Sequence, residues 1–253
     1  MNDESLAHTL ARVRIDAHPQ WTRSVSPYTL IRRYWNASKA DAARAELVAL
    51  MKRECSERAE GGDTRTLGAS RLARRRPRRY PLVIEFADDP LLRRAAAQHL
   101  SLKHNVTVDT LASVTRPGAA SGGGWHVDQH ERGLKAIMYL DDVDEFNGPF
   151  AVLLDYAGAT IAPLPGRLGR RFGDAAIARA VHRGARVVPL HAPRGSVILF
   201  ETSSIHRGLP CARGTRHSVT NYYANTPGIC RLGGGLGGGP GHRTGPASKT
   251  TVS

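Results

Sequence analysis

Apolar residues between about 42 and 51 recur every three to four positions, which is the spacing of one face of a helix. Leu47, Leu50 and Met51 share such a face and are expected to be packing residues. Ser38, followed three residues later by Asp41, has the residue types of a helix start. The pattern therefore predicts a helix that begins near residue 38 and packs one side against a core.

Shorter elements are expected after this helix. Asp89 and Pro90 supply an N-cap and a first-turn proline for a second helix over 91–100. Residues 80–86 form a short apolar run, which predicts a strand. Residues 61–79 are polar and basic, which is typical of a solvated loop. The first part of the chain is therefore expected to be mixed in structure.

From about residue 104 onward, the pattern changes to short apolar runs separated by turn residues. The expected strands are 106–114, 135–140, 149–154, 186–190, 196–201 and 218–223. Asn147-Gly148, between two of these runs, predicts a hairpin or a tight turn, and residues 174–182 predict a short helix. Many short strands with turns between them are typical of a sandwich or a barrel. The chain is therefore expected to be mainly β with flanking helices.

Length and composition fit a globular protein. The 253 residues are enough for one well-buried core with decorations, or for two small domains. No apolar run reaches membrane-spanning length, and residues 1–5 lack the basic-then-apolar layout of a secretory signal. Cys55, Cys211 and Cys230 are odd in number and widely spaced, which predicts neither a disulfide framework nor a zinc site. We therefore expect no membrane partner and a cytoplasmic, reducing location.

The formal net charge of +14 comes mostly from arginine. A surplus of this size attracts nucleic acid or anionic small molecules. However, most arginines are scattered, and the basic run 74–79 has no interleaved aromatic residues that could stack on bases. A solvated, arginine-rich surface is therefore favoured over a nucleic-acid site. The glycine-rich tail, residues 227–253, lacks a strand–loop–helix context for phosphate binding and is expected to be disordered.

Candidate chemistry begins at His126 and Asp128. Side chains two residues apart in a strand point to the same face, so an imidazole and a carboxylate would lie side by side. This His-x-Asp pair alone is a weak signal. His206 follows a strongly β-like segment, and a histidine from such a distant strand would complete one triangular face of a metal. Two histidines and one carboxylate, with the remaining positions open, suit non-haem iron(II) oxygenases.

Arg216 adds a second candidate function to this set. It lies ten residues after His206, at the start of the next expected strand. A guanidinium at this place could clamp a carboxylate through two parallel hydrogen bonds. A metal together with a fixed arginine suits a small dicarboxylate that chelates iron at one end and forms a salt bridge at the other.

The order of these motifs resembles that of the iron(II)/2-oxoglutarate-dependent dioxygenases, and within them the phytanoyl-CoA dioxygenase-like family. The segments that carry the resemblance are 124–128 (Gly-Trp-His-Val-Asp), 139–143 leading to 147–149, 195–200, 206–208, and Arg216 leading to 221–223. They span roughly residues 104 to 225, about half of the chain. The ordered series is much more specific than any one of its pieces.

The resemblance implies a double-stranded β-helix core, a cupin-like jelly roll, over residues 104–226. An N-terminal helical and mixed segment, 1–103, would pack on this core, and the tail 227–253 would follow it. His126, Asp128 and His206 would be the iron ligands, and Arg216 would bind the distal carboxylate of 2-oxoglutarate. Oxygen would convert this cosubstrate to succinate and carbon dioxide, and the iron would oxidise a nearby carbon.

Two residues refine what the resemblance implies. Related halogenases replace the carboxylate ligand with a small residue to make room for chloride, so Asp128 favours hydroxylation over halogenation. Related Jumonji-type and asparaginyl oxygenases place a cosubstrate-binding lysine on a strand comparable to that of Lys135. Because Lys135 shares a face with Ile137 and Tyr139, it is expected either to point into the barrel and contact 2-oxoglutarate, or to lie at the rim with its head in water.

The leading hypothesis is therefore an iron(II)- and 2-oxoglutarate-dependent enzyme that oxidises a C–H bond of a small molecule. The positive charge suits a substrate that is anionic or linked to a carrier or to CoA. One alternative is a jelly-roll protein that binds a metal or an anion without turnover. The other is an oxygenase directed at nucleic acid, which is less favoured because the repair enzymes of that kind carry a second arginine soon after the first. Here no arginine follows Arg216 until Arg231.

Overall fold

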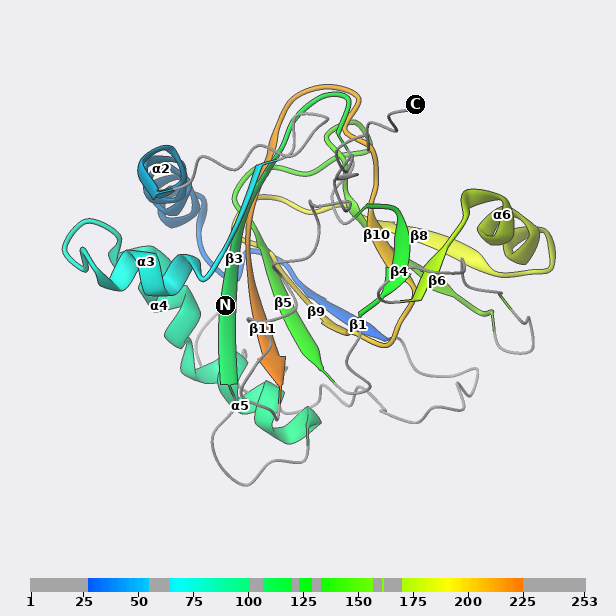
Figure 1. Ribbon diagram of the computed structural model, residues 1–253, viewed down its shortest axis with the longest axis horizontal. Coiled ribbons are helices and arrows are strands. Elements are labelled where there is room, and N and C mark those ends of the chain that lie inside the picture. The colour runs from blue at the N-terminus through cyan, green and yellow to red at the C-terminus, as the bar shows by residue number, and fades with distance from the viewer. Residues whose placement is uncertain are drawn as a thin grey trace, which may run out of the picture.

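The computed structural model of the chain describes residues 27–54, 64–100, 107–119, 123–128, 133–156, 161 and 170–224. Within these ranges the chain forms two facing antiparallel sheets with helices on their outer sides (Figure 1). The six-stranded sheet has the order β1 (Tyr28–Ile31), β9 (Val197–Glu201), β5 (Leu134–Tyr139), β11 (Arg216–Ala224), β3 (Thr107–Thr115) and β2 (Thr64–Leu67). The five-stranded sheet has the order β7 (Arg170–Phe172), β4 (Trp125–Val127), β10 (His206–Gly208), β6 (Phe150–Leu154) and β8 (Arg186–Leu190).

Most successive strands alternate between the two sheets. From β3 to β6 the chain changes sheet at every strand, and from β8 to β11 it does so again. Two antiparallel sheets connected in this way make a jelly roll. The predicted mainly β fold with a jelly-roll core is therefore confirmed.

The helices cover the outer faces of the sheets. The helices α2 (Ala37–Glu54), α3 (Ala69–Arg74), α4 (Pro81–Asp88) and α5 (Pro90–His99) lie beside the six-stranded sheet, and α6 (Asp174–His182) lies beside the five-stranded sheet (Figure 1). Alternate residues of β5, β9 and β11 pack against the first group of helices, among them Met138, Leu199 and Val219. The residues between them, such as Ile137 and Phe200, face the other sheet. Each central strand thus has one helix-facing side and one side that faces the interior of the jelly roll.

All three expected helices are present as α2, α5 and α6, with one change at a boundary. Helix α5 begins at Pro90 as predicted, and its N-cap Asp89 accepts hydrogen bonds from the backbone N–H groups of Leu91 and Leu92. Helix α2 begins at Ala37, and the side chain of Asn36, rather than that of Ser38, accepts a hydrogen bond from Lys39 N at 2.8 Å. Asparagine is as effective an N-cap as serine, and here it lies two residues earlier.

The strand predicted over residues 80–86 is wrong, because this segment is part of helix α4. Pro81 occupies the first helical position, where its missing N–H costs nothing. The Glu46 carboxylate of α2 accepts hydrogen bonds from the next two backbone N–H groups, those of Leu82 and Val83. Short apolar runs do not distinguish a strand from a buried helix, and the N–H acceptor that favours the helix comes from a distant element.

Two other expectations are corrected by the topology. Residues 61–79 were expected to be a loop, but they contain β2 and α3, and the arginine-rich turn after α3 is exposed. Asn147-Gly148 does not close a hairpin, because β5 and β6 belong to different sheets. It is a tight turn between the sheets, in which Gly148 has a φ of 75° and a Cβ would meet Leu209 O at 2.7 Å.

Several expectations concern residues outside the described ranges. Among them are the tail 227–253, Cys55 and Cys230. The division of the chain at residues 103 and 226 stays a prediction. Among the described helices, none combines the length and the apolar character that a membrane span requires.

The turn before β9 provides a stability prediction. Gly195 has a φ of 80°, and a Cβ built on it would collide with the backbone carbonyl of Trp35. We expect Gly195→Ala to lower the free energy of unfolding by about 3 kcal/mol or more, because backbone strain and a steric clash add together. Gly184→Ala is the matched control, since Gly184 has a φ of 104° but open space around it. Urea unfolding that shows equal losses for both variants would contradict this explanation.

Candidate metal centre

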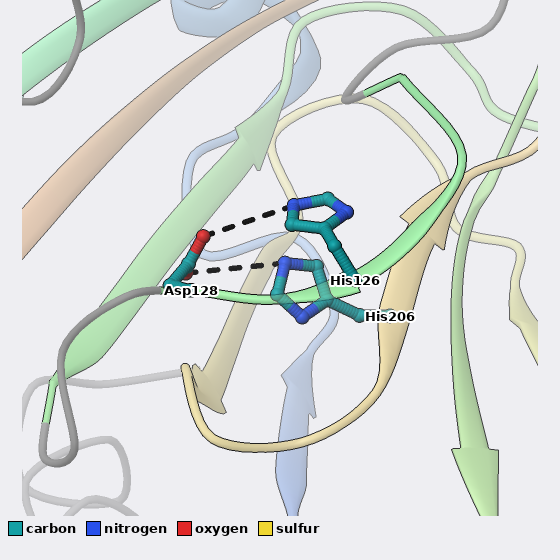
Figure 2. Close-up of side chains that lie close together, drawn as sticks. All are labelled: His126, Asp128 and His206. Atoms are coloured by element: carbon teal, nitrogen blue, oxygen red, sulfur yellow. Dashed lines mark ion pairs between the residues drawn. The ribbon is translucent and has the colours of Figure 1, made fainter. Parts of the chain in front are cut away.

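Three of the predicted site residues come together between the two sheets. His126 lies on β4, Asp128 follows directly after that strand, and His206 begins β10. β4 and β10 are antiparallel neighbours in which His206 pairs with His126. One ligand atom from each of the three residues lies within 4.8 Å of the others (Figure 2). A single strand pairing therefore brings together His126 and His206, which lie about eighty residues apart in the sequence.

The ligand atoms face one another around the Asp128 carboxylate. His126 Nε2 lies 3.7 Å from Asp128 Oδ1, and His206 Nε2 lies 3.9 Å from Asp128 Oδ2 (Figure 2). The two imidazole rings are 4.3 Å apart between centroids and tilted by 54°. These separations are too long for hydrogen bonds but suit three ligands around a shared ion.

The tautomers of both histidines are fixed by backbone carbonyls. His126 Nδ1 lies 2.8 Å from Gly124 O, and His206 Nδ1 lies 2.8 Å from Ser204 O. A carbonyl oxygen only accepts hydrogen bonds, so each Nδ1 must carry the proton. In a neutral imidazole this leaves Nε2 with a lone pair. Both lone pairs are then available on the side of the ring that faces Asp128.

The protonation states agree with this geometry. Burial lowers the pKa of His126 to about 4, although the nearby Asp128 charge opposes the shift. Burial also lowers the pKa of His206 well below its usual value. For Asp128, burial alone would raise the pKa, but the charges of Lys135 and of the two histidines lower it to about 2. At neutral pH the site therefore consists of two neutral nitrogen ligands and one carboxylate, the donor set that a divalent transition metal prefers.

Lys135 lies inside the jelly roll, with only 6% of its surface exposed. Its Nζ forms an ion pair with Asp128 Oδ2 at 2.7 Å and lies 4.4 Å from the centre of the Tyr222 ring. Burial would lower the pKa of Lys135, but the opposing effects of Asp128 and Tyr222 raise it. The expectation that Lys135 points into the barrel is confirmed, and the alternative of a rim lysine with its head in water is wrong. Its contact with 2-oxoglutarate stays a prediction.

Arg216 is also buried, with 4% of its surface exposed, and its Nη2 donates a hydrogen bond to Thr115 Oγ1 at 3.2 Å. It lies on the interior side of β11, at the opposite end from Tyr222, which pairs with Lys135 on β5. Six residues of strand, roughly 20 Å, separate Arg216 from the level of Lys135. The backbone positions of Arg216 and Lys135 therefore lie toward opposite ends of the interior wall.

The polar character of this wall escaped the sequence interpretation. Every second residue of β11 from Arg216 to Tyr222 is polar and faces the interior of the jelly roll, and the set comprises Arg216, Ser218, Thr220 and Tyr222. The same alternation extends to β3, where Ser113 and Thr115 pair with Ser218 and Arg216. A search for period-two polarity in the last predicted strand would have found this lining.

A similar fold occurs in solved structures of known enzymes. The non-haem alpha-ketoglutarate-dependent epimerase SnoN from nogalamycin biosynthesis aligns with a TM-score of 0.61 at 17% identity, over 98% of this chain and 97% of its own. The carbocyclase SnoK of the same biosynthesis aligns at 0.60 and 15% identity, over 86% and 85%. This chain has the fold of the 2-oxoglutarate-dependent oxygenases. Iron-bound EctD from S. alaskensis, at 0.58 and 17% identity over 84% and 82%, shares this fold.

The resemblance to this oxygenase fold is structural. No family model matches the sequence, and no curated protein matches it either. Among the solved structures, SnoN has been described in complex with Fe³⁺ and alpha-ketoglutarate, and HygX from Streptomyces hygroscopicus with nickel and 2-oxoglutarate. The fold expected from the ordered motifs is thus confirmed at a level of identity where the sequence alone finds no match.

Proposed function

We propose that this protein is an iron(II)- and 2-oxoglutarate-dependent oxygenase that uses molecular oxygen to oxidise a C–H bond of a small molecule. The observation that carries the proposal is the meeting of two Nε2 lone pairs, from His126 and His206, with the ionised carboxylate of Asp128. Both imidazole protons are already committed to backbone carbonyls. A cation with open coordination positions fits this donor set, and iron(II) is the metal that such a triad suits.

In this proposal the protein positions the reactants, and the bound metal supplies the oxidation chemistry. His126, Asp128 and His206 would hold the iron, and a set of three protein ligands would leave other positions for the cosubstrate and oxygen. The Gly124 and Ser204 carbonyls keep the two imidazole rings oriented, which preserves ligand geometry. The aromatic ring of Phe200, 4.8 Å from the His206 ring between centroids, helps to keep water from the site.

Arg216 is proposed to bind the distal carboxylate of 2-oxoglutarate. Its guanidinium is buried on the interior side of β11, in a lining of hydroxyl groups that includes Thr115 and Ser218. A charged group in such a place is stable when an anion shares the burial. A dicarboxylate held at the metal could place its distal carboxylate beside this guanidinium, and the hydroxyl groups could satisfy its remaining oxygens.

Asp128 favours hydroxylation over halogenation, because the carboxylate occupies the position that a halide would need. Other oxidative outcomes, such as desaturation or ring formation, use the same triad. The substrate is proposed to be anionic, or linked to a carrier or to CoA. Arg171 supports this class: it pairs with His126 across β4 and β7, and its charge contributes to lowering the pKa of His126. We further propose a cytoplasmic location, where reducing conditions keep iron ferrous.

Nucleic acid is a poorer candidate for the substrate. The arginine-rich turn at residues 74–79 is exposed between α3 and α4, which cover the outer face of the six-stranded sheet. The triad comes from β4 and β10 of the five-stranded sheet, whereas α3 and α4 lie beside the six-stranded sheet (Figure 1). A nucleic acid held by this turn would therefore lie across the helical layer from the metal ligands.

The test is oxygen-dependent turnover. The protein, with iron(II) and 2-oxoglutarate, would be incubated with a panel of small molecules that includes matched pairs of acids and their neutral esters or amides. We expect one succinate to form per substrate oxidised, with the acids preferred. Tight binding of metal and anion with no succinate above the metal-only background would instead indicate a binding protein. A strongly salt-dependent association with DNA or RNA would support the nucleic-acid alternative.

A further inference from the structure

We propose that Lys135 is a positioning residue that holds Asp128 to the metal through a single oxygen. This inference rests on the proposed function, since it concerns the iron site described above. It differs from the role that the sequence resemblance implies for this lysine, which is binding of the cosubstrate. The basis is the contact between the Lys135 ammonium and one particular oxygen of the Asp128 carboxylate.

The two oxygens of Asp128 have different neighbours. Oδ2 forms the ion pair with Lys135 Nζ at 2.7 Å and faces His206 Nε2 at 3.9 Å, whereas Oδ1 faces His126 Nε2 at 3.7 Å. Opposite charges this close in a buried place attract each other strongly. Oδ2 is therefore engaged by the protein, and Oδ1 is the oxygen presented beside the first histidine ligand.

The position of Lys135 is itself fixed by its neighbours. On β5 it pairs with Tyr222 of β11 on one side and with Phe200 of β9 on the other. Its Nζ lies 4.4 Å from the centre of the Tyr222 ring and 5.6 Å from that of Phe200. Contacts of a cation with two aromatic rings, inside a three-strand register, leave the ammonium little freedom to leave Oδ2.

The number of carboxylate oxygens on the metal decides how many positions stay open. In a six-coordinate site, two histidines and one carboxylate oxygen leave three positions, of which a chelating 2-oxo acid takes two and oxygen the third. If Asp128 bound through both oxygens, only two positions would remain. A chelating cosubstrate and oxygen could then not bind together. Lys135 would keep the third position open by occupying Oδ2.

A role in metal affinity alone does not explain a lysine at this place. The ammonium carries a positive charge beside the carboxylate that would hold a dication, and like charges repel strongly in a buried site. With a neutral side chain of similar volume at position 135, the three ligands would bind the metal more tightly. The lysine is therefore expected to weaken metal binding slightly while it preserves cosubstrate binding, and these opposite effects provide a specific test.

The experiment compares the wild-type protein with Lys135→Met, which keeps the length of the side chain and removes the charge and the hydrogen bond. Mn(II) affinity is measured by electron paramagnetic resonance, and 2-oxoglutarate affinity by anaerobic absorbance titration of the iron(II) protein. We expect Mn(II) binding at least as tight as in the wild type. We expect 2-oxoglutarate binding to weaken by about tenfold or more, the range typical of lost outer-shell partners. A crystal structure of the Mn(II)-loaded variant should show both Asp128 oxygens on the metal.

Two further variants support the comparison. Lys52→Met removes an exposed lysine of α2 and should leave both affinities unchanged. Lys135→Arg retains a donor for Oδ2 and should retain most of the 2-oxoglutarate affinity, and it remains informative if Lys135→Met does not fold.

The inference is overturned if Lys135→Met binds 2-oxoglutarate as the wild type does, or if it loses metal and cosubstrate affinity together. Equal loss of 2-oxoglutarate affinity in Lys135→Met and Lys135→Arg would also contradict it. Failure of the proposed function would look different, because the wild-type protein itself would then bind no iron(II) and 2-oxoglutarate.

Discussion

Asp128→Ala is expected to lower the affinity of the protein for iron(II) by about a hundredfold or more and to abolish turnover. Mutation of a residue that only supports a metal ligand typically lowers metal affinity roughly 10–100-fold. Asp128 is itself the charged ligand of the triad, so its loss should cost more. The two histidines would remain neutral, because burial lowers the pKa of both. Without the carboxylate, no anionic ligand from the triad offsets the charge of the metal.

The variant must be separated from a loss of folding. Asp128 is the ion-pair partner of the buried Lys135, so its removal leaves an uncompensated charge, which typically costs about 3–5 kcal/mol of stability. The double variant Asp128→Ala/Lys135→Met removes both charges and should recover much of that stability without recovering metal binding. Mn(II) binding and urea unfolding measure the two effects separately.

Asp142→Asn is the matched control for Asp128→Ala. Asp142 is an exposed carboxylate that lies beside Arg194. Its substitution should therefore leave metal binding unchanged. If the double variant bound Mn(II) as tightly as the wild type, Asp128 would not be a metal ligand and the assignment of the triad would be wrong.

Arg216→Ala is expected to weaken 2-oxoglutarate binding by about a hundredfold, with iron(II) binding nearly unchanged. Loss of one partner of a buried, hydrogen-bonded charge pair typically costs about 2–5 kcal/mol, and the lower part of this range corresponds to the expected change. Iron(II) binding should be nearly unchanged because Arg216 lies at the far end of β11 from Tyr222, the residue that pairs with Lys135. The effect should appear in the KM for 2-oxoglutarate.

Two other arginine variants test whether charge alone or geometry is responsible. Arg216→Lys keeps a positive charge but loses the planar pair of donors, so it should recover only part of the affinity. Arg213→Ala removes an exposed arginine that lies over the Phe146 ring, 3.6 Å from its centroid, and should bind 2-oxoglutarate normally. Equal losses in Arg213→Ala and Arg216→Ala would show that the cosubstrate responds to general positive charge, which would contradict the assigned role.

Strand alternation, a short-range pattern, predicted that His126 and Asp128 share one face. The jelly roll and the role of His206 as the third ligand were implied by the resemblance of the ordered motifs to a known family. The features that the sequence pattern did not predict depend on residues from distant parts of the chain. Residues 80–86 are helical because Glu46 from α2 accepts their first N–H groups. Nothing within the segment itself carries that information.

The direction of Lys135 was undecided for the same reason. Its alternation with Ile137 and Tyr139 permits both a buried and a rim position, since a long side chain near a strand end can turn toward water. The outcome depends on Asp128, which follows β4 in the other sheet, and on Tyr222, which lies nearly ninety residues later in the sequence. Pairings of this kind come from strand register, and register is a property of the folded sheets.

The most direct test of the central claim is an anaerobic absorbance titration of the wild-type protein with iron(II) and 2-oxoglutarate. If His126, Asp128 and His206 hold iron with open positions beside them, a visible charge-transfer band should develop. It should saturate at one iron and one 2-oxoglutarate per chain, and it should be absent in His126→Ala. A wild-type protein that gave no band under these conditions, or a band that persisted in His126→Ala, would contradict the proposed metal centre.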